Sequence, residues 1–173
     1  MTNRFRLLVA TLCWPVLIVS CSSPSAPPEE PKEESRLSGS VALMAWNMMY
    51  VAADLNAPAD TAVLVSDRSA IGPWETFTVV ELDSGRIALK TSNDRYVTAD
   101  RERGGLLLAN RTEMGAWERF EVVNVTPDLV ALRNSNGYFV SADLDKGGIL
   151  VADRLEAGKW ERFAPVPVVA KSK

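Results

Sequence analysis

An internal repeat of 43 residues limits the folds that are open to this chain. Trp74, Trp117 and Trp160 are 43 residues apart, and the sequence around each tryptophan reads Gly-x-Trp-Glu-x-Phe. Upstream of that motif, each copy contains Val-Ala-Leu or Ile-Ala-Leu, then Tyr/Phe-Val-x-Ala-Asp, then a segment that ends in arginine. The three arginines are Arg68, Arg111 and Arg154. Copy one has a three-residue insertion between Asp54 and Leu64, and the repetition predicts three structurally equivalent units.

Each copy contains four short segments rich in β-branched, aromatic or leucine residues and separated by turn formers, a pattern that predicts strands. In copy three, the predicted strands are 130–133, 138–142, 149–153 and 160–166. Asn136-Gly137 predicts a two-residue type I′ turn, in which both central residues have positive φ. Twelve strands in three copies are too few for a propeller. The predicted fold class is therefore all-β, a single β-trefoil with a six-stranded barrel and three hairpins.

The repeated sequence resembles that of the fascin-like β-trefoils, which belong to the actin-crosslinking-like superfamily. The resemblance covers all three copies, roughly residues 41–165, whereas the Gln-x-Trp signature of ricin-type trefoils is absent. It implies a fold and, more weakly, a binding role. Fascin bundles actin with four tandem trefoils, but this chain has one trefoil behind an export signal. Actin is therefore not expected as a partner.

The N-terminus resembles the signal peptide of a bacterial lipoprotein. Arg4 and Arg6 precede an apolar run, 7–19, that is too short to span a hydrocarbon core of about 30 Å. Ile18-Val19-Ser20-Cys21 is similar to a lipobox, which implies cleavage before Cys21 and acylation of that residue. An ordinary signal peptide with a coincidental cysteine is the alternative. Ser22 stands where an aspartate would favour inner-membrane retention, so we expect a lipid-anchored envelope protein, on the outer membrane if the organism is Gram-negative.

Composition divides the rest of the chain. Residues 22–39 contain Ser, Pro, Glu and Lys with almost no apolar side chains, so a flexible linker is expected to follow Cys21 after the 1–20 signal. The trefoil is expected over 40–167, and 168–173 form a tail. The expected repeats are about 40–84, 85–127 and 128–167. Loss of the signal changes the formal net charge from −3 to −5, and an acidic domain without a basic stripe is not expected to bind nucleic acid.

The residue types that carry most enzyme chemistry are missing. The chain has no histidine, Cys13 leaves with the signal, and Cys21 is the expected site of lipidation. Zinc would lack its usual ligands, so no cofactor, metal or catalytic residue is expected. An enzyme that uses only carboxylates is the remaining catalytic alternative, and calcium held by turn carboxylates is the remaining metal alternative.

Residues that recur in all three copies are interpreted as structural. The repeated tryptophans are expected in the core, each with the phenylalanine three residues later, namely Phe77, Phe120 and Phe163. The alternative is that sugars stack on their indole faces. The acids that follow the tryptophans are expected to pair with the repeated arginines; they are Glu75, Glu118 and Glu161. The acids that end the second strand of each copy are expected to hydrogen-bond turn backbone. These are Asp54, Asp100 and Asp143.

The first hairpin of copy one breaks the repeat. It reads Met44-Ala45-Trp46-Asn47-Met48-Met49, where the other copies have charged and hydroxyl side chains. Hairpin tips face solvent, so Met44, Trp46, Met48 and Met49 are predicted to form an exposed apolar cluster that binds a ligand or partner. The alternative is that they pack under the insertion around residues 55–62 or against the linker. Tyr138, in the corresponding hairpin of copy three, is the fifth candidate binding residue.

These features favour a membrane-anchored, non-catalytic binding module. The leading hypothesis is that it binds a polysaccharide or glycoconjugate, with Trp46 as the ring on which a sugar stacks. The alternative is a protein-interaction or inhibitor-like lipoprotein that docks an envelope partner through the same hairpin. Methionine fits this alternative better, because sugars prefer aromatic and polar contacts.

Overall fold

Twelve strands and three short 3-10 helices make up the computed structural model, which describes residues 37–58 and 61–169. All of these residues belong to one unit of the chain, Glu33–Lys173. The expected signal peptide, Cys21 and the linker as far as residue 36 lie outside the described residues, as do residues 170–173. Within the described ranges, no helix has the length and apolar character needed to cross a bilayer.

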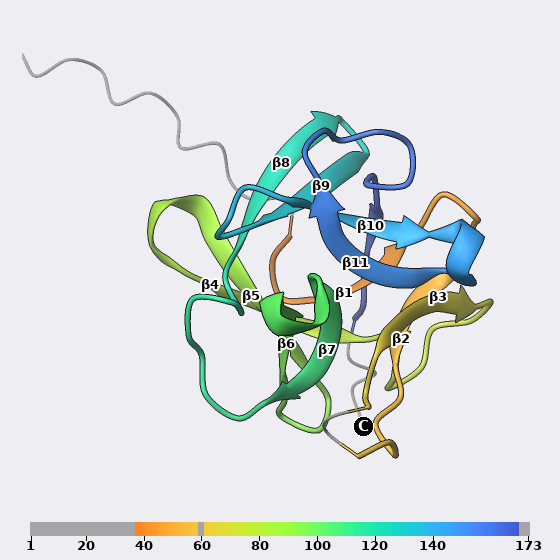
Figure 1. The fold of residues 1–173 in the computed structure, drawn as a ribbon. Coiled ribbons are helices and arrows are strands. Elements are labelled where there is room, and N and C mark those ends of the chain that lie inside the picture. Colours follow the sequence, from red (N-terminus) through yellow and green to blue (C-terminus); the bar gives the residue numbers. More distant parts are fainter. Residues whose placement is uncertain (1–36, 59–60, 170–173) are drawn as a thin grey trace, which may run out of the picture. The chain divides into compact units, whose positions relative to one another are not determined.

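The strands form three groups of four, which follow one another from orange through green to blue in Figure 1. The first group is β1 (Ser40–Met44), β2 (Tyr50–Ala53), β3 (Leu64–Arg68) and β4 (Phe77–Glu81). The second is β5 (Arg86–Thr91), β6 (Tyr96–Asp100), β7 (Leu106–Arg111) and β8 (Phe120–Thr126). The third is β9 (Leu129–Asn134), β10 (Phe139–Asp143), β11 (Ile149–Arg154) and β12 (Ala164–Pro167). The 3-10 helices are η1 (Asp83–Gly85), η2 (Arg101–Arg103) and η3 (Leu144–Lys146).

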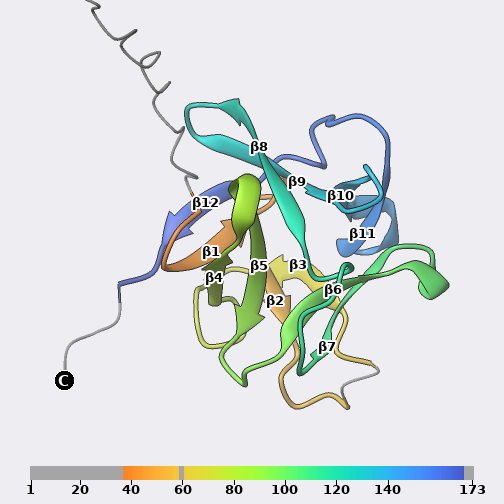
Figure 2. The ribbon, with the colours of Figure 1, turned by 90° about the vertical axis from the view of Figure 1, so that its left-hand side faces the viewer.

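Six of the strands close into a barrel. Antiparallel pairs join β12 to β1, β1 to β4, β4 to β5, β5 to β8 and β8 to β9. Figure 2 shows β12 alongside β1. A bridge between Val130 and Phe163, the residue before β12, completes the ring. The equivalent pairs in the other copies are Val41 with Phe77 and Ile87 with Phe120. Closure of the ring leaves the barrel without an open edge.

The remaining six strands form three hairpins that meet around a common centre, where Figure 1 shows β3, β7 and β11. Three equivalent backbone hydrogen bonds, each 2.8–2.9 Å long, join the hairpins in a cycle. They run from Ala109 to Ala62, from Ala152 to Gly105 and from Ser66 to Gly148. A Cβ on Gly105 would lie 2.4 Å from the Ala152 carbonyl oxygen, which explains the need for glycine there. The predicted all-β fold, a single β-trefoil, is confirmed.

The repeated motif buries its phenylalanine and its glutamate, but not its tryptophan. The three phenylalanines are fully buried, whereas the three tryptophans are half-buried at the surface, so placing the tryptophans in the core was wrong. The inward position is taken by the carboxylate: Glu75 Oε2 accepts the Gly72 N–H at 2.7 Å, and Glu118 does the same for Gly115 at 2.6 Å. The corrected residues are Trp74, Trp117 and Trp160.

The repeated arginines lie beside the buried carboxylates, and Arg68 and Arg111 also lie over an indole ring. The Nε–Oε1 distances are 3.8 Å for Arg68–Glu75, 4.0 Å for Arg111–Glu118 and 3.9 Å for Arg154–Glu161. The guanidinium carbon of Arg68 lies 5.3 Å from the ring centre of Trp74, and that of Arg111 lies 6.0 Å from Trp117. Such stacking covers one face of an exposed indole.

The acids that end the second strands act on their turns in two ways. Asp54 and Asp100 each accept a backbone N–H two residues later, at 3.0 Å. Asp143 bonds the Lys146 side chain, with Oδ2 and Nζ 2.9 Å apart, and also accepts a backbone hydrogen bond from Lys146. The Lys146 ammonium lowers the pKa of the Asp143 carboxyl.

Candidate functional site

The first hairpin of each copy turns in the same way. In each, a backbone N–H bonds the carbonyl three residues earlier at 3.0 Å, as Gly137 does to Asn134. The donor residue has positive φ: 62° in Met48, 64° in Asp94 and 86° in Gly137. Asn136 is not in this conformation, so the predicted type I′ turn was wrong. The loop is instead a turn followed by one left-handed residue, and glycine occupies that last position in copy three.

The Met/Trp hairpin of copy one is exposed. Trp46 is 55% exposed and Met48 is 68% exposed, while Met49 is also exposed and Met44 is half-buried. The alternative that these residues pack under the inserted segment does not hold for Trp46 and Met48, because both are exposed. The alternative that they pack against the linker lies outside the described residues. The described residues therefore show a solvent-facing apolar tip.

We call the hollow beside this tip the apolar groove; its volume is about 290 Å³. It is lined by Met44, Ala45, Trp46, Met48, Leu129, Arg162 and Ala164. Lys159 Nζ lies 6.0 Å from the centre of the Trp46 ring. Arg162 Nη2 donates to the Ala157 carbonyl at 3.3 Å, and its buried Nε has no hydrogen-bond partner in the described part of the chain. The groove therefore combines an apolar floor with two cations.

A second groove lies at the equivalent boundary, between copies two and three. We call it the cationic groove; its volume is about 270 Å³. It is lined by Arg86, Arg119, Glu121, Arg133, Asn134, Ser135 and Gly137. These residues correspond one to one, through the repeat, to Leu129, Arg162, Ala164, Met44, Ala45, Trp46 and Met48. Equivalent positions of the barrel therefore form an apolar groove at one repeat boundary and a charged groove at another.

The strand register confirms that the two grooves are equivalent. Glu121 pairs with Arg133 across β8 and β9, and Met44 pairs with Ala164 across β1 and β12. At the third boundary, the corresponding cross-strand pair is Thr78 with Lys90. Lys90 Nζ lies 2.8 Å from the Asp94 carboxylate, and this ion pair lowers the pKa of Asp94 and raises that of Lys90.

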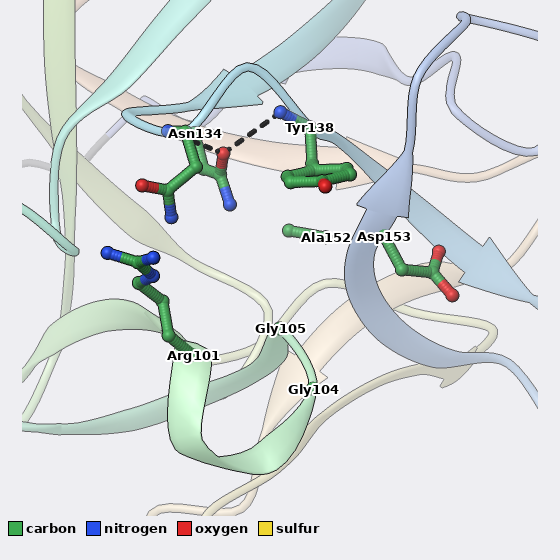
Figure 3. A pocket seen from close by; sticks show the side chains of 8 residues that line it. Arg101, Gly104, Gly105, Asn134, Tyr138, Ala152 and Asp153 are labelled. Atoms are coloured by element: carbon green, nitrogen blue, oxygen red, sulfur yellow. Dashed lines mark hydrogen bonds between the residues drawn. The ribbon is translucent and has the colours of Figure 1, made fainter.

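Tyr138 lies apart from the Met/Trp tip, in what we call the tyrosine cleft, a hollow of about 300 Å³ between copies two and three (Figure 3). The cleft is lined by Arg101, Gly104, Gly105, Asn134, Asn136, Tyr138, Ala152 and Asp153. Tyr138 is 39% exposed, and Arg101 extends from η2 towards its hairpin. Asn134 Oδ1 accepts the backbone N–H groups of Asn136 and Tyr138 at 3.0 Å, which holds this hairpin in place. Of the five candidate binding residues, Met44, Trp46 and Met48 line the apolar groove and Tyr138 lines the tyrosine cleft, whereas Met49 is exposed but lines neither.

In copy one, the asparagine at the corresponding position makes a different contact. There, Asn47, the counterpart of Asn136, donates through Nδ2 to the Ser66 carbonyl at 2.8 Å and ties the hairpin to β3. Sequence reasoning did not single out Arg101 or Asp153, and it singled out Asn136 only as a turn former, because the lining residues come from different elements. The only available signal was that this hairpin carries a tyrosine where copy two has Arg95.

No group of three or more histidine, cysteine, aspartate or glutamate side chains suited to a metal ion occurs among the residues that the structure describes. What the clefts offer instead is aromatic, amide, carboxylate and guanidinium groups for non-covalent binding.

Comparison with known proteins supports the fold. The model of the FRG1-like domain matches residues 46–166, and no curated protein matches the chain. ThreeFoil, a designed threefold-symmetric protein, is 14% identical with a TM-score of 0.67, over 76% of this chain and 100% of ThreeFoil. A Clostridium perfringens endo-β-galactosidase that releases GlcNAcα1-4Gal is 9% identical with a TM-score of 0.62, over 77% of this chain and 34% of the enzyme. The expected resemblance to fascin-like β-trefoils is confirmed.

Proposed function

Since the chain belongs to the FRG1-like domain family, we propose that it is a non-catalytic binding module for a polysaccharide or glycoconjugate, held at a membrane by acyl chains on Cys21. The observation that carries the glycan assignment is the tyrosine cleft. The Clostridium endo-β-galactosidase is carbohydrate-active by name, and the shared fold is compatible with a glycan ligand. The chain spans about a third of that enzyme, so the likeness supports the proposal only at the level of the fold.

The tyrosine cleft has the mixture of groups that a sugar requires. A pyranose ring presents an apolar face and a rim of hydroxyl groups, so it needs an aromatic surface with polar groups beside it. Tyr138 supplies an exposed ring, and the lining adds the guanidinium of Arg101 and the amide of Asn136. A volume of about 300 Å³ suits a small part of a glycan chain.

Trp46 is less suited to this role than Tyr138. The only side chain in the lining of the apolar groove that offers strong hydrogen bonds is Arg162. A sugar bound there would lose water from its hydroxyl groups without adequate replacement partners. The structure therefore favours Tyr138 as the stacking ring, in place of the predicted Trp46.

The glycan proposal is tested by calorimetric titration of the full-length protein, in detergent, against a panel of neutral and acidic polysaccharides. We expect saturable binding that Tyr138→Ala weakens about tenfold, which corresponds to about 1.4 kcal/mol. Met49→Ala, at the matching position of copy one, is the control and should bind normally. The proposal is wrong if no glycan binds, or if Tyr138→Ala and Met49→Ala lose the same amount of affinity.

The anchor is tested separately. We expect a radiolabelled or alkyne-tagged fatty acid to be incorporated into the protein in cells, and Cys21→Ser to abolish the incorporation. Equal labelling of the Ser variant would show that Cys21 is not the acylated residue. Fractionation of the same cells would then test the proposed outer-membrane location.

A protein partner at the apolar groove is the second candidate function. Exposed tryptophan and methionine side chains are typical of adaptable interfaces, and Lys159 and Arg162 add cations beside them. These groups would suit a partner segment that carries an aliphatic or aromatic side chain next to an aspartate or glutamate. A photoreactive residue in place of Trp46 should then crosslink one stoichiometric partner in intact cells. Diffuse products, or the same products from a photoreactive residue at Ser92, the matching site in copy two, would exclude this role.

A further inference from the structure

The cationic groove concentrates positive charge on a chain whose formal net charge is −3. Three arginines and one glutamate are the charged residues in its lining. Glu121 is occupied by Arg133, which bonds Oε2 through Nε at 3.0 Å and Nη2 at 2.6 Å. No carboxylate therefore remains in the lining to neutralise Arg86 and Arg119.

Arg86 and Arg119, the two remaining arginines, contact only neutral carbonyl groups in the hydrogen bonds that the structure shows. Arg119 Nε donates to the Gly115 carbonyl at 3.1 Å, and Arg86 Nε lies 3.5 Å from the Asp83 carbonyl. Among the described residues, neither guanidinium has a carboxylate within 4.0 Å. A guanidinium has five N–H donors, so each of these arginines keeps donors for another acceptor.

The trefoil does not require this charge. The barrel is built equally well with Leu129 or Ser40 in the position of Arg86, and with Thr76 in the position of Arg119, although copy three keeps an arginine there, Arg162. At the boundary between copies one and two, the one lysine is neutralised by Asp94. Arg86, and with it the meeting of three arginines at one boundary, is therefore a local addition to the repeat, which points to a ligand rather than to the fold.

The cationic groove and the tyrosine cleft share one hairpin. Asn134 lines both hollows, and its buried side chain holds the backbone of the hairpin that separates them. A glycan whose ring rests on Tyr138 can therefore extend across this hairpin into the cationic groove.

We propose that the cationic groove binds an oxyanion, a sulfate or carboxylate group, of the glycan, so that the ligand is an acidic polysaccharide. The inference rests on the proposed glycan function and specifies its ligand class. The fork of N–H donors on arginine matches pairs of oxygens on sulfate and carboxylate groups, and charge-assisted bonds of this kind are about twice as strong as neutral ones.

The test measures the affinity of the full-length protein for dextran, dextran sulfate and polygalacturonate, which carry no acid, sulfates and carboxylates, respectively. We expect an acidic probe to bind at least about tenfold more tightly than dextran, and Arg86→Gln combined with Arg119→Gln to remove that preference. Arg162→Gln, at the matching site of the apolar groove, is the control and should retain it. The two acidic probes distinguish sulfate from carboxylate as the recognised group.

Several outcomes separate this inference from the glycan proposal. Equal affinity for all three probes, or equal loss in the Arg162→Gln control, overturns the cationic groove as the site. Tyr138-dependent binding of neutral glycans with no acidic preference overturns the groove and leaves the tyrosine cleft standing. Acidic binding that requires Arg86 and Arg119 but not Tyr138 supports the groove and overturns the cleft. Thermal unfolding of each variant establishes that a loss of binding is not a loss of fold.

Discussion

Met48 and Gly137 occupy the same left-handed position in two equivalent hairpin turns, with φ angles of 62° and 86°. Glycine adopts this conformation without steric penalty, whereas a side chain with a Cβ costs about 1 kcal/mol. Met48 is also 68% exposed, so burial does little to offset the strain. A partner at the apolar groove, as proposed, would account for a strained, solvent-facing methionine beside Trp46.

Met48→Asn is expected to raise the free energy of unfolding by about 0.5–1 kcal/mol, because asparagine tolerates the left-handed conformation better. The measurement is urea denaturation. Gly137→Ala measures the cost of a side chain in the matching turn. Open space surrounds the Cβ position of Gly137, so only backbone strain should act, and the free energy of unfolding should fall by a similar amount. If Met48→Asn lowers stability, the methionine side chain holds the hairpin and the strain interpretation fails.

Gly104 and Gly105 are expected to differ in their tolerance of alanine. Both have positive φ, but a Cβ on Gly104 meets open space, whereas one on Gly105 lies 2.4 Å from the Ala152 carbonyl oxygen. Gly104→Ala should cost about 1 kcal/mol, and Gly105→Ala at least twice as much, because it also separates two hairpins. Chemical denaturation of both variants checks this; equal losses would contradict the close approach.

Thr98 and Ser141 occupy equivalent buried positions, but only one has a partner. Thr98 Oγ1 donates to Glu118 Oε1 at 2.8 Å, whereas Ser141 Oγ has no hydrogen-bond partner among the described residues. Thr98→Val should therefore lower the free energy of unfolding by about 1–3 kcal/mol, because a buried carboxylate loses a donor. Ser141→Ala should be neutral or stabilising by the same measurement. A costly Ser141→Ala would show that its hydroxyl has a partner after all.

The Asp143–Lys146 pair predicts a pH dependence of stability. Because the pKa of Asp143 is lowered in the folded state, its contribution is complete above the unfolded value of about 3.9 and is lost as pH falls through the folded pKa. Lys146 is largely exposed, so Lys146→Met should cost no more than about 1 kcal/mol at pH 7. The difference from the wild type should vanish in acid.

Denaturation curves collected across that pH range check the prediction. Lys159→Met is the control, because this lysine has no carboxylate within 4.0 Å in the described residues. A Lys146→Met deficit that persists unchanged in acid would assign its effect to packing rather than to the ion pair.

The trefoil could be predicted from the sequence because its requirements are local and occur three times. Phe77, Phe120 and Phe163 recur at one spacing because each closes the same barrel junction, and the Gly-x-Trp-Glu-x-Phe motif that carries them can be read without knowing any long-range contact. The exposed Met/Trp tip was also readable, since it interrupts a pattern that the other copies keep.

The proposed binding surfaces could not be predicted in the same way, because they form only where two repeats meet. Arg86, Arg119 and Arg133 come from three different segments of the chain, and the barrel register places them in one groove, with Glu121 opposite Arg133. Tyr138 likewise gains Arg101 as a neighbour only when η2 of one copy folds against the hairpin of the next. Residue patterns within a repeat report burial and turns, whereas the chemistry of a boundary depends on which side chains the closed barrel brings together.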